Sequence, residues 1–336
     1  MKTKYKSSDL LKFIIPSLLG VILFMVPIND GGNITIPVAF FTTRLKELIG
    51  DYFPTLSMIV VVIAASLTII TKAFKPKFII ENNFLNSLLN VNWIWTIGRI
   101  LGGLFILSAF TGFGPEIIKS DLTGAFILND LLPTLIVVFF FAGLFLPLLL
   151  NFGLLEFCGA LLTKIMRPLF KLPGRSSIDC MTSWLGDGTI GVLLTSKQYE
   201  EGFYTEREAC IVSTMFSVVS ITFSFVVLSQ VGLENMFIPF YLTVTFAGIV
   251  AAIILPRVWP LSKKPDAYFN NAEPKNVEDV PEGFTPFTFG VFKAVEKAQN
   301  ESSLKKFFAD GIKNVLEMWI GVLPVVMAMG TLALMI

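Results

Sequence analysis

The chain has 336 residues, of which 54% are hydrophobic and 15% are charged, and its formal net charge is +1. Soluble domains carry about 25% charged residues, so this composition excludes an ordinary soluble domain and predicts an all-α, polytopic transmembrane helical bundle. The near-zero net charge gives no reason to expect a nucleic acid as a partner. The chain contains no histidine, which excludes Ser-His and Cys-His dyads and histidine-based zinc sites.

The three cysteines, Cys158, Cys180 and Cys210, lie far apart in apolar runs, and no Cys-x-x-Cys pair occurs. This spacing is typical of buried free thiols rather than of a disulfide or a metal cluster. We therefore expect neither a metal site nor a cofactor.

Apolar runs near the roughly 20-residue length of a membrane span recur along the chain. Lysines precede the first run and no small-residue cleavage site follows Pro27, so we expect a retained transmembrane helix rather than a signal peptide. Arg99, early in the third run, is expected to snorkel to the interface. The stretch 36–49 contains three charged residues and is expected to be interfacial or re-entrant. The predicted spans are 11–28, 55–74, 93–113, 131–151, 208–229, 237–256 and 314–336.

The loops between these runs alternate between rich and poor in Lys and Arg, and basic loops stay on the cytoplasmic side. The basic segments are the N-terminal tail, 72–77, 164–175 and 257–310. The loops 29–35 and 230–235 contain no Lys or Arg. This alternation predicts a multi-pass membrane protein with its N-terminus in the cytoplasm. We expect the membrane to be the bacterial cytoplasmic (inner) membrane.

The polar stretch 178–194 does not fit this alternation as a span. If it crossed the bilayer, every later loop would change sides and the basic loop after Arg257 would be external. The sequence therefore predicts a re-entrant hairpin over about 176–195 that is buried in protein, because irregular backbone cannot face lipid.

Four regions follow from these predictions: N-terminal transmembrane helices at 1–130, a hairpin-containing domain at 131–256, a cytoplasmic loop at 257–311 and a last helix at 312–336. The proline-rich start of the loop is typical of a flexible connector. Within it, 289–308 is expected to be an amphipathic helix at the membrane surface. Because the last apolar run reaches Ile336 without a polar tail, we expect a longer parent protein.

Functional residues are expected in the polar stretch, because polar groups at membrane depth are costly and persist where they line a site or a water path. Ser176 or Ser177 is expected to cap a short helix, and two glycines then break the chain around Asp187. Two half-helices that meet at an unwound centre resemble the substrate sites of secondary transporters. The candidate solute-binding residues are Asp179, Ser183, Trp184, Gly186, Asp187, Gly188, Thr189 and Gln198.

Each candidate also has a structural explanation. Asp187 could bond the amides of its own glycine-rich turn, and Asp179 could favour the helix dipole. Trp184 could pack rather than stack on a solute, and Gln198 could lie at the surface. Downstream, Thr205 and Glu208 have the spacing of a capping box, which is a structural signal.

The run LPGRSSIDCMTSWLGDGTIGVLLTSKQYEEGFYTEREA resembles the signature of nucleoside-recognition, or Gate-domain, membrane proteins of the YjiH type. The resemblance implies an integral membrane protein with a small-solute site in the hairpin, and it names no substrate. Members of this type continue into a second Gate-like segment that this chain lacks. A homo-oligomer, a partner Gate-domain subunit or a truncated inactive product would each account for that difference.

The leading hypothesis is a secondary transporter or permease for a nucleoside-like or other small polar solute, with or without a coupling ion. The alternative is a non-transporting assembly or regulatory protein of the membrane that acts with a partner subunit. Both hypotheses make the protein a non-enzyme embedded in the lipid bilayer. An intramembrane aspartyl protease using Asp179 and Asp187 is disfavoured, because the first glycine of the required Gly-x-Gly-Asp element is missing before Asp187.

Overall fold

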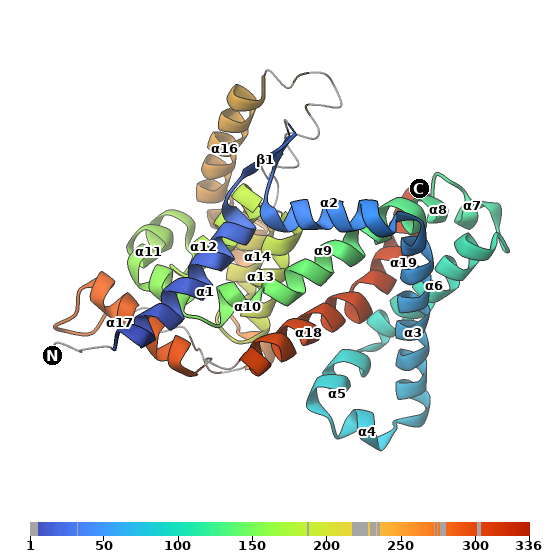
Figure 1. Ribbon diagram of the computed structural model, residues 1–336, viewed down its shortest axis with the longest axis horizontal. Coiled ribbons are helices and arrows are strands. Elements are labelled where there is room, and N and C mark those ends of the chain that lie inside the picture. Colours follow the sequence, from blue (N-terminus) through green and yellow to red (C-terminus); the bar gives the residue numbers. More distant parts are fainter. Residues whose placement is uncertain are drawn as a thin grey trace. The chain divides into compact units, whose positions relative to one another are not determined.

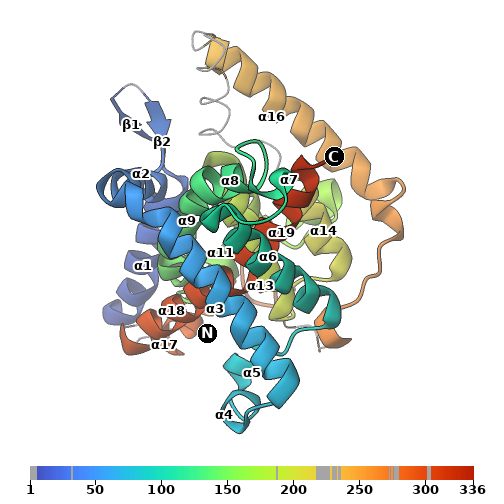
Figure 2. The same cartoon turned by 90° about the vertical axis from the view of Figure 1, so that its right-hand side faces the viewer.

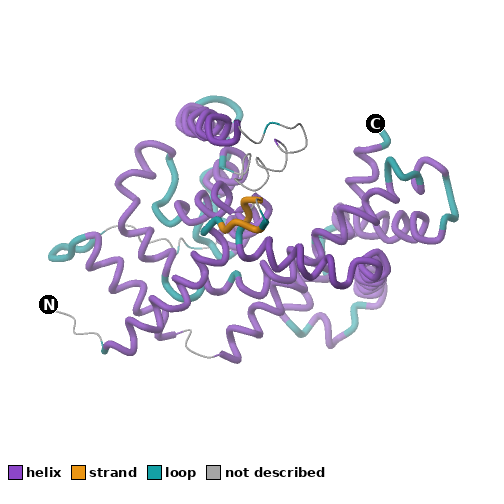
Figure 3. The backbone as a smooth tube through the Cα atoms, turned by 45° about the horizontal axis from the view of Figure 1, so that its top comes forward, coloured by secondary structure: helices purple, strands orange, loops and turns teal. Residues whose placement is uncertain are grey.

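The computed structural model is almost entirely helical in the part of the chain that it describes, apart from one small antiparallel strand pair (Figure 3). The described residues are 6–31, 33–186, 188–216, 228, 233, 236–271, 273, 275, 280–300 and 304–336. This architecture confirms the predicted all-α class.

The chain forms two compact units, each assembled from two separate stretches of sequence (Figure 1). The first unit contains Met1–Phe40 and Phe145–Phe307, and the second contains Phe41–Leu144 and Phe308–Ile336. The α-helices and strands that begin in the first unit are α1 (Ser7–Met25), β1 (Ile28–Asp30), β2 (Asn33–Thr35), α2 (Pro37–Ile49), α10 (Pro147–Leu150), α11 (Leu154–Phe170), α12 (Ser176–Met181), α13 (Gly188–Glu200), α14 (Glu206–Met215), α16 (Phe237–Ile254), α17 (Pro286–Asn300) and α18 (Leu304–Gly321). Those of the second unit are α3 (Phe53–Phe74), α4 (Lys77–Ile80), α5 (Asn83–Leu89), α6 (Trp93–Thr111), α7 (Glu116–Lys119), α8 (Gly124–Phe126), α9 (Leu132–Phe145) and α19 (Leu323–Leu334).

Short 3-10 and π-helical turns connect several of these elements. The 3-10 turns are η1 (Gly50–Tyr52), η5 (Leu255–Arg257), η6 (Leu261–Lys263) and η7 (Phe269–Asn271). The π-helical turns are η2 (Ile127–Leu131) and η3 (Thr182–Gly186).

Six helical stretches in the described residues are long and apolar enough to cross a membrane. They are Ser7–Met25, Pro37–Phe74, Trp93–Thr111, Glu116–Leu150, Phe237–Lys263 and Lys305–Leu334. The protein is therefore a multi-pass membrane protein, as its composition predicts. The interfacial stretch predicted at 36–49 is α2, which continues through η1 into α3 with a bend between them (Figure 1). Of the span predicted at 208–229, α14 accounts for the start, and 217–227 lies outside the described residues.

The second unit is held together by close packing of α6 against α3 and α19. Glycines permit this approach: a Cβ on Gly102 would collide with the Pro324 carbonyl, and one on Gly103 would lie 2.8 Å from the Ala65 Cβ. Arg99 on α6 is only 3% exposed and donates to Thr68 Oγ1 at 3.1 Å and to the Leu88 carbonyl at 2.8 Å. The prediction that Arg99 snorkels to the interface is therefore wrong. Polar groups of α3 and α5 accept its hydrogen bonds inside the protein.

In the first unit, α17 packs against α11 and α1. The buried side chains of Phe13, Ala294 and Ala298 form this contact, with the ring of Phe157 against it. Of the helix predicted at 289–308, α17 accounts for 289–300 and α18 begins at Leu304. The apolar face of α17 is covered by protein helices rather than by a membrane surface. An amphipathic sequence pattern shows that one face of a helix is buried, but it does not show whether protein or membrane covers that face.

The start of the predicted flexible loop is bound to the beginning of α14. The Glu206 amide donates to the Ala267 carbonyl at 2.8 Å, and Arg207 Nε donates to the Lys264 carbonyl at 2.8 Å. An isolated bridge also joins Thr205 to Tyr268. This part of the loop is thus fixed in place rather than free. The preceding helix is α16 (Figure 2). Its exposed apolar side chains include Ile238, Leu242 and Phe246, as expected of a helix in contact with lipid.

Candidate functional site

The polar stretch folds as an antiparallel helical hairpin made of α12, the π-helical turn η3 and α13. Thr195 on α13 donates to Asp179 on α12, and a Cβ on Gly191 would lie only 2.6 Å from the Ser183 Cβ. These two pairs are placed symmetrically in the sequence, so the chain reverses direction between η3 and α13. Its placement in the bilayer stays a prediction. π-Helical turns are rare and occur frequently at functional sites.

The carboxylate of Asp179 lies at the centre of this hairpin and is fully buried. Its Oδ2 accepts hydrogen bonds from Thr195 Oγ1 and from the Tyr204 hydroxyl, both at 3.0 Å. Its Oδ1 has no hydrogen-bond partner among the described residues. Asp179 lies outside the six candidate spans, and burial raises its pKa to about 7 despite the opposing effects of the two hydroxyls and Arg175.

Several other buried side-chain oxygens of the hairpin also lack a hydrogen-bond partner in the described part of the chain. They belong to Ser177, Thr182, Ser183 and Gln198, none more than 5% exposed. An unpaired buried polar group costs roughly 1–3 kcal/mol, and such groups are few in native proteins. A concentration of them in one hairpin indicates a polar interior suited to a polar ligand, ion or water.

The structure describes some of the candidate solute-binding residues but not all of them. Asp179, Ser183 and Gln198 are buried. Gln198 belongs to the hairpin, since α13 continues past it to Glu200. Gly186 ends η3 and Gly188 begins α13, so one helical segment ends and the next begins on either side of the predicted break. Asp187 lies outside the described residues, and so does the side chain of Thr189.

Trp184 packs against the rest of the first unit. Its ring lies 5.2 Å from that of Phe216, and a Cβ on Gly248 would be 3.3 Å from it. The Tyr241 hydroxyl donates to the Trp184 carbonyl at 2.8 Å. These contacts anchor η3 to α14 and α16 and favour the packing explanation, although its role toward a solute stays a prediction.

The residues that sequence reasoning missed are the partners of Asp179. Thr195 could have been found by pairing positions symmetrically about the glycine-flanked break at 187. Tyr204 carries no comparable signal, because it reaches Asp179 from the loop after α13.

The capping predictions had opposite outcomes. Thr205 and Glu208 form the predicted capping box at the start of α14. The predicted serine cap of α12 is wrong: Arg175 occupies the cap position without a side-chain cap, and Ser176 Oγ donates to the Pro173 carbonyl at 2.7 Å.

Comparison with known proteins places this hairpin in a described domain. Residues 132–234 match the model of the Gate family, which is described as nucleoside recognition. The chain is also 48% identical over 330 residues to an uncharacterized protein of Alkalihalophilus pseudofirmus, covering 98% of this chain and 71% of that protein. The chain belongs to the nucleoside-recognition (Gate) family. The matched Gate region begins at α9 and contains the whole α12–α13 hairpin. No solved structure matches the chain.

Proposed function

We propose that this Gate-family protein is a secondary transporter or permease for a nucleoside-like or other small polar solute, which binds inside the α12–α13 hairpin. The observation that carries the proposal is the cluster of buried, unpartnered oxygens around Asp179. The description of the family as nucleoside recognition supports the solute class. Helices that break at a glycine-flanked centre are also the usual binding elements of transporters.

In this proposal the hairpin recognises hydroxyl and amino donors of the solute. Asp179 Oδ1 and Gln198 Oε1 are acceptors that lack a protein donor among the described residues, and the Ser183 and Thr182 hydroxyls can donate or accept. Asp187, Gly186, Gly188 and Thr189 would complete the site at the turn. A proton or another coupling ion would neutralise Asp179 when no solute donor reaches it.

The proposal assigns the protein no catalytic role. It places the protein in the bacterial cytoplasmic membrane, with the basic loops and the N-terminus in the cytoplasm. A homo-oligomer or a partner Gate-domain subunit would supply any second repeat that a complete site requires.

Uptake into proteoliposomes tests the proposal. Radiolabelled uridine, adenosine and hypoxanthine would be offered to vesicles containing the wild-type protein, Asp179→Asn or Lys164→Gln. Lys164 is exposed on α11 and is not part of the hairpin, so it serves as the control. We expect saturable uptake of at least one solute, reduced at least about tenfold by Asp179→Asn because a hydrogen bond to a charged group contributes about 1.5–3 kcal/mol.

Uptake that is equal in all three proteins would contradict the placement of the site. Absence of uptake from well-folded wild-type protein would contradict transport by this chain alone. It would favour the assembly or regulatory function instead.

A further inference from the structure

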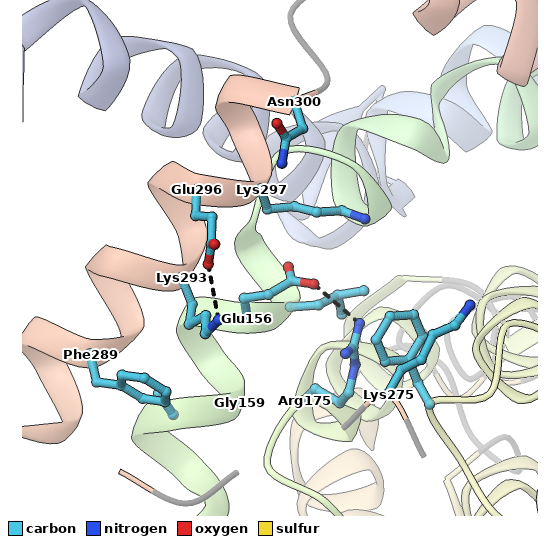
Figure 4. Close-up of a pocket in the computed structure, with 12 residues that line it drawn as sticks. Glu156, Gly159, Arg175, Lys275, Phe289, Lys293, Glu296, Lys297 and Asn300 are labelled. Carbon is cyan, nitrogen blue, oxygen red and sulfur yellow. Dashed lines mark hydrogen bonds and ion pairs between the residues drawn. The ribbon is translucent and has the colours of Figure 1, made fainter. Parts of the chain in front are cut away.

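A second polar site lies outside the hairpin interior. A cavity of about 280 Å³ opens beside α11, α17 and the start of α12 (Figure 4). The charged side chains that line it are Arg175, Lys275, Lys293, Lys297, Glu156 and Glu296. Leu155 and Phe289 add apolar surface, so the cavity has one charged and one apolar part.

Arg175 is the most buried cation of this cavity, at 4% exposed. Its guanidinium lies over the Phe203 ring, 3.6 Å from the ring centre, and an Arg175 nitrogen is 3.6 Å from a Glu156 oxygen. Stacking on an aromatic ring fixes the plane of the guanidinium and keeps its other donors available. Within the described residues, neither Arg175 Nε nor Glu156 Oε2 has a hydrogen-bond partner. The pair is therefore long and incompletely satisfied, unlike a bidentate one.

Two lysines of α17 line the same cavity one turn apart. Lys293 pairs with Glu296 at 2.9 Å, whereas the Lys297 ammonium forms no ion pair or hydrogen bond with the described residues. Like charges four residues apart disfavour a helix, so helix stability does not explain this pair. The helix dipole favours a lysine in the last turn, but it does not require that lysine to line a cavity.

The cavity keeps an excess of positive charge when the neighbouring groups are included. Glu201 also interacts electrostatically with Lys297, Arg175 and Lys275, and burial raises the pKa of Glu201. The neighbouring groups also include Lys197, which interacts with Glu201, and Asp179, which interacts with Arg175. Five cations then face four carboxylates, Glu156, Asp179, Glu201 and Glu296. The excess is largest while Glu201 remains protonated. An anion is therefore the ligand that this cavity fits.

We propose that this cavity binds a phosphate group, with Arg175, Lys293 and Lys297 as its cationic contacts. Convergent lysines and an oriented guanidinium suit the several oxygens of phosphate better than they suit a single carboxylate. Both a small soluble phosphomonoester and the headgroup of an anionic lipid carry this chemistry. The proposal goes beyond the transport function and does not depend on it.

Thermal unfolding of the purified protein in detergent tests the site, with inorganic phosphate or glycerol 3-phosphate added at constant ionic strength. A ligand at about 100 times its Kd stabilises a two-state fold measurably. We expect a saturable rise in Tm for the wild-type protein and an apparent affinity at least tenfold lower for the double variant Lys293→Gln/Lys297→Gln. Lys164→Gln, an exposed change on α11 outside the cavity, should respond as the wild type does.

Asp179→Asn should also keep the full phosphate response, so failure of the transport proposal and failure of this one are distinguishable. Nanodiscs of phosphatidylcholine with and without phosphatidylglycerol show whether the phosphate group comes from a lipid headgroup or from a soluble phosphomonoester. A lysine-dependent stabilisation by phosphatidylglycerol, without any response to glycerol 3-phosphate, identifies a lipid headgroup. A response to glycerol 3-phosphate identifies a soluble ligand, and both outcomes support the phosphate site. An equal response of the double variant and the wild type, or no saturable response to any of these probes, would overturn the proposal.

Discussion

Two buried carboxylates in the first unit, Glu208 at the start of α14 and Asp179 in the hairpin, have opposite environments. Glu208 Oε1 accepts from Arg167, and its Oε2 accepts from the Thr205 amide in the capping box. Asp179 has hydroxyl donors on Oδ2 and no partner on Oδ1 in the described chain. Both side chains are at most 5% exposed, so burial alone does not distinguish them.

The difference between them shows how structure and function can be told apart in a buried polar residue. A carboxylate whose oxygens are all paired inside the protein stabilises the fold and has little left to offer a ligand. A carboxylate with an unpaired oxygen carries a desolvation cost that a ligand can relieve.

The largest effect on stability is expected at Glu208. Glu208→Ala removes the half of the capping box that accepts from the Thr205 amide and leaves Arg167 without this partner, which should cost about 2–3 kcal/mol in free energy of unfolding. Denaturant unfolding in detergent measures this cost. Glu47→Ala, which breaks the exposed pair with Arg44, should cost under about 1 kcal/mol. Equal costs for the two variants would refute the structural role of Glu208.

A somewhat smaller effect is expected where α13 packs against η3. Gly191→Ala would place a Cβ 2.6 Å from the Ser183 Cβ, and overpacking of this kind costs about 1–3 kcal/mol. It should also weaken solute binding, because Ser183 must shift. Gly98→Ala on α6, whose nearest atom is Val325 Cγ2 at 3.8 Å, is the control and should not destabilise the protein in the same assay. A fully stable Gly191→Ala would contradict the close hairpin.

Asp179→Asn is expected to separate binding from stability. The amide keeps the shape of the side chain, so the free energy of unfolding should change by less than about 1 kcal/mol, whereas solute affinity should fall about tenfold, or about 1.4 kcal/mol. Equilibrium binding of whichever nucleoside is transported measures the affinity. A large loss of stability without a loss of affinity would make Asp179 a structural residue like Glu208.

The smallest effect is the pH dependence of stability. Because burial raises the pKa of Asp179 from 3.8 to about 7, the folded protein holds a proton that the unfolded chain has lost. The contribution of this proton to the free energy of unfolding is fully present below about pH 3.8 and is lost as the pH rises through about 7. Between pH 6 and 7.5 the loss should be on the order of 1 kcal/mol. Unfolding curves at several pH values should show a shallower slope for Asp179→Asn, and identical slopes would count against the buried proton.

Local patterns in the sequence predicted much of the molecule. Hydropathy predicted the membrane helices, the Thr205 to Glu208 spacing predicted a capping box, and the glycines around position 187 predicted the break in the hairpin. Each of these features depends on residues that are close in the chain, so each leaves a readable pattern.

Contacts between distant segments were not predictable in the same way. Tyr204 reaches Asp179 only because the loop after α13 folds back, and Arg99 is buried because α3 and α5 supply acceptors. The amphipathic pattern of α17 likewise fits either a membrane surface or the protein helices that cover it. Tertiary packing decided each case.

The most direct test of the hairpin site is thermal unfolding of the wild-type protein, Asp179→Asn and Thr205→Ser with uridine, adenosine and hypoxanthine as probes. Thr205→Ser keeps the capping hydroxyl and serves as a conservative control outside the hairpin. We predict a saturable rise in Tm with at least one probe for the wild type and Thr205→Ser, and a rise that requires about tenfold more of the same probe for Asp179→Asn. An equal rise in all three proteins, or no rise with any probe in a well-folded wild type, would contradict a solute site around Asp179.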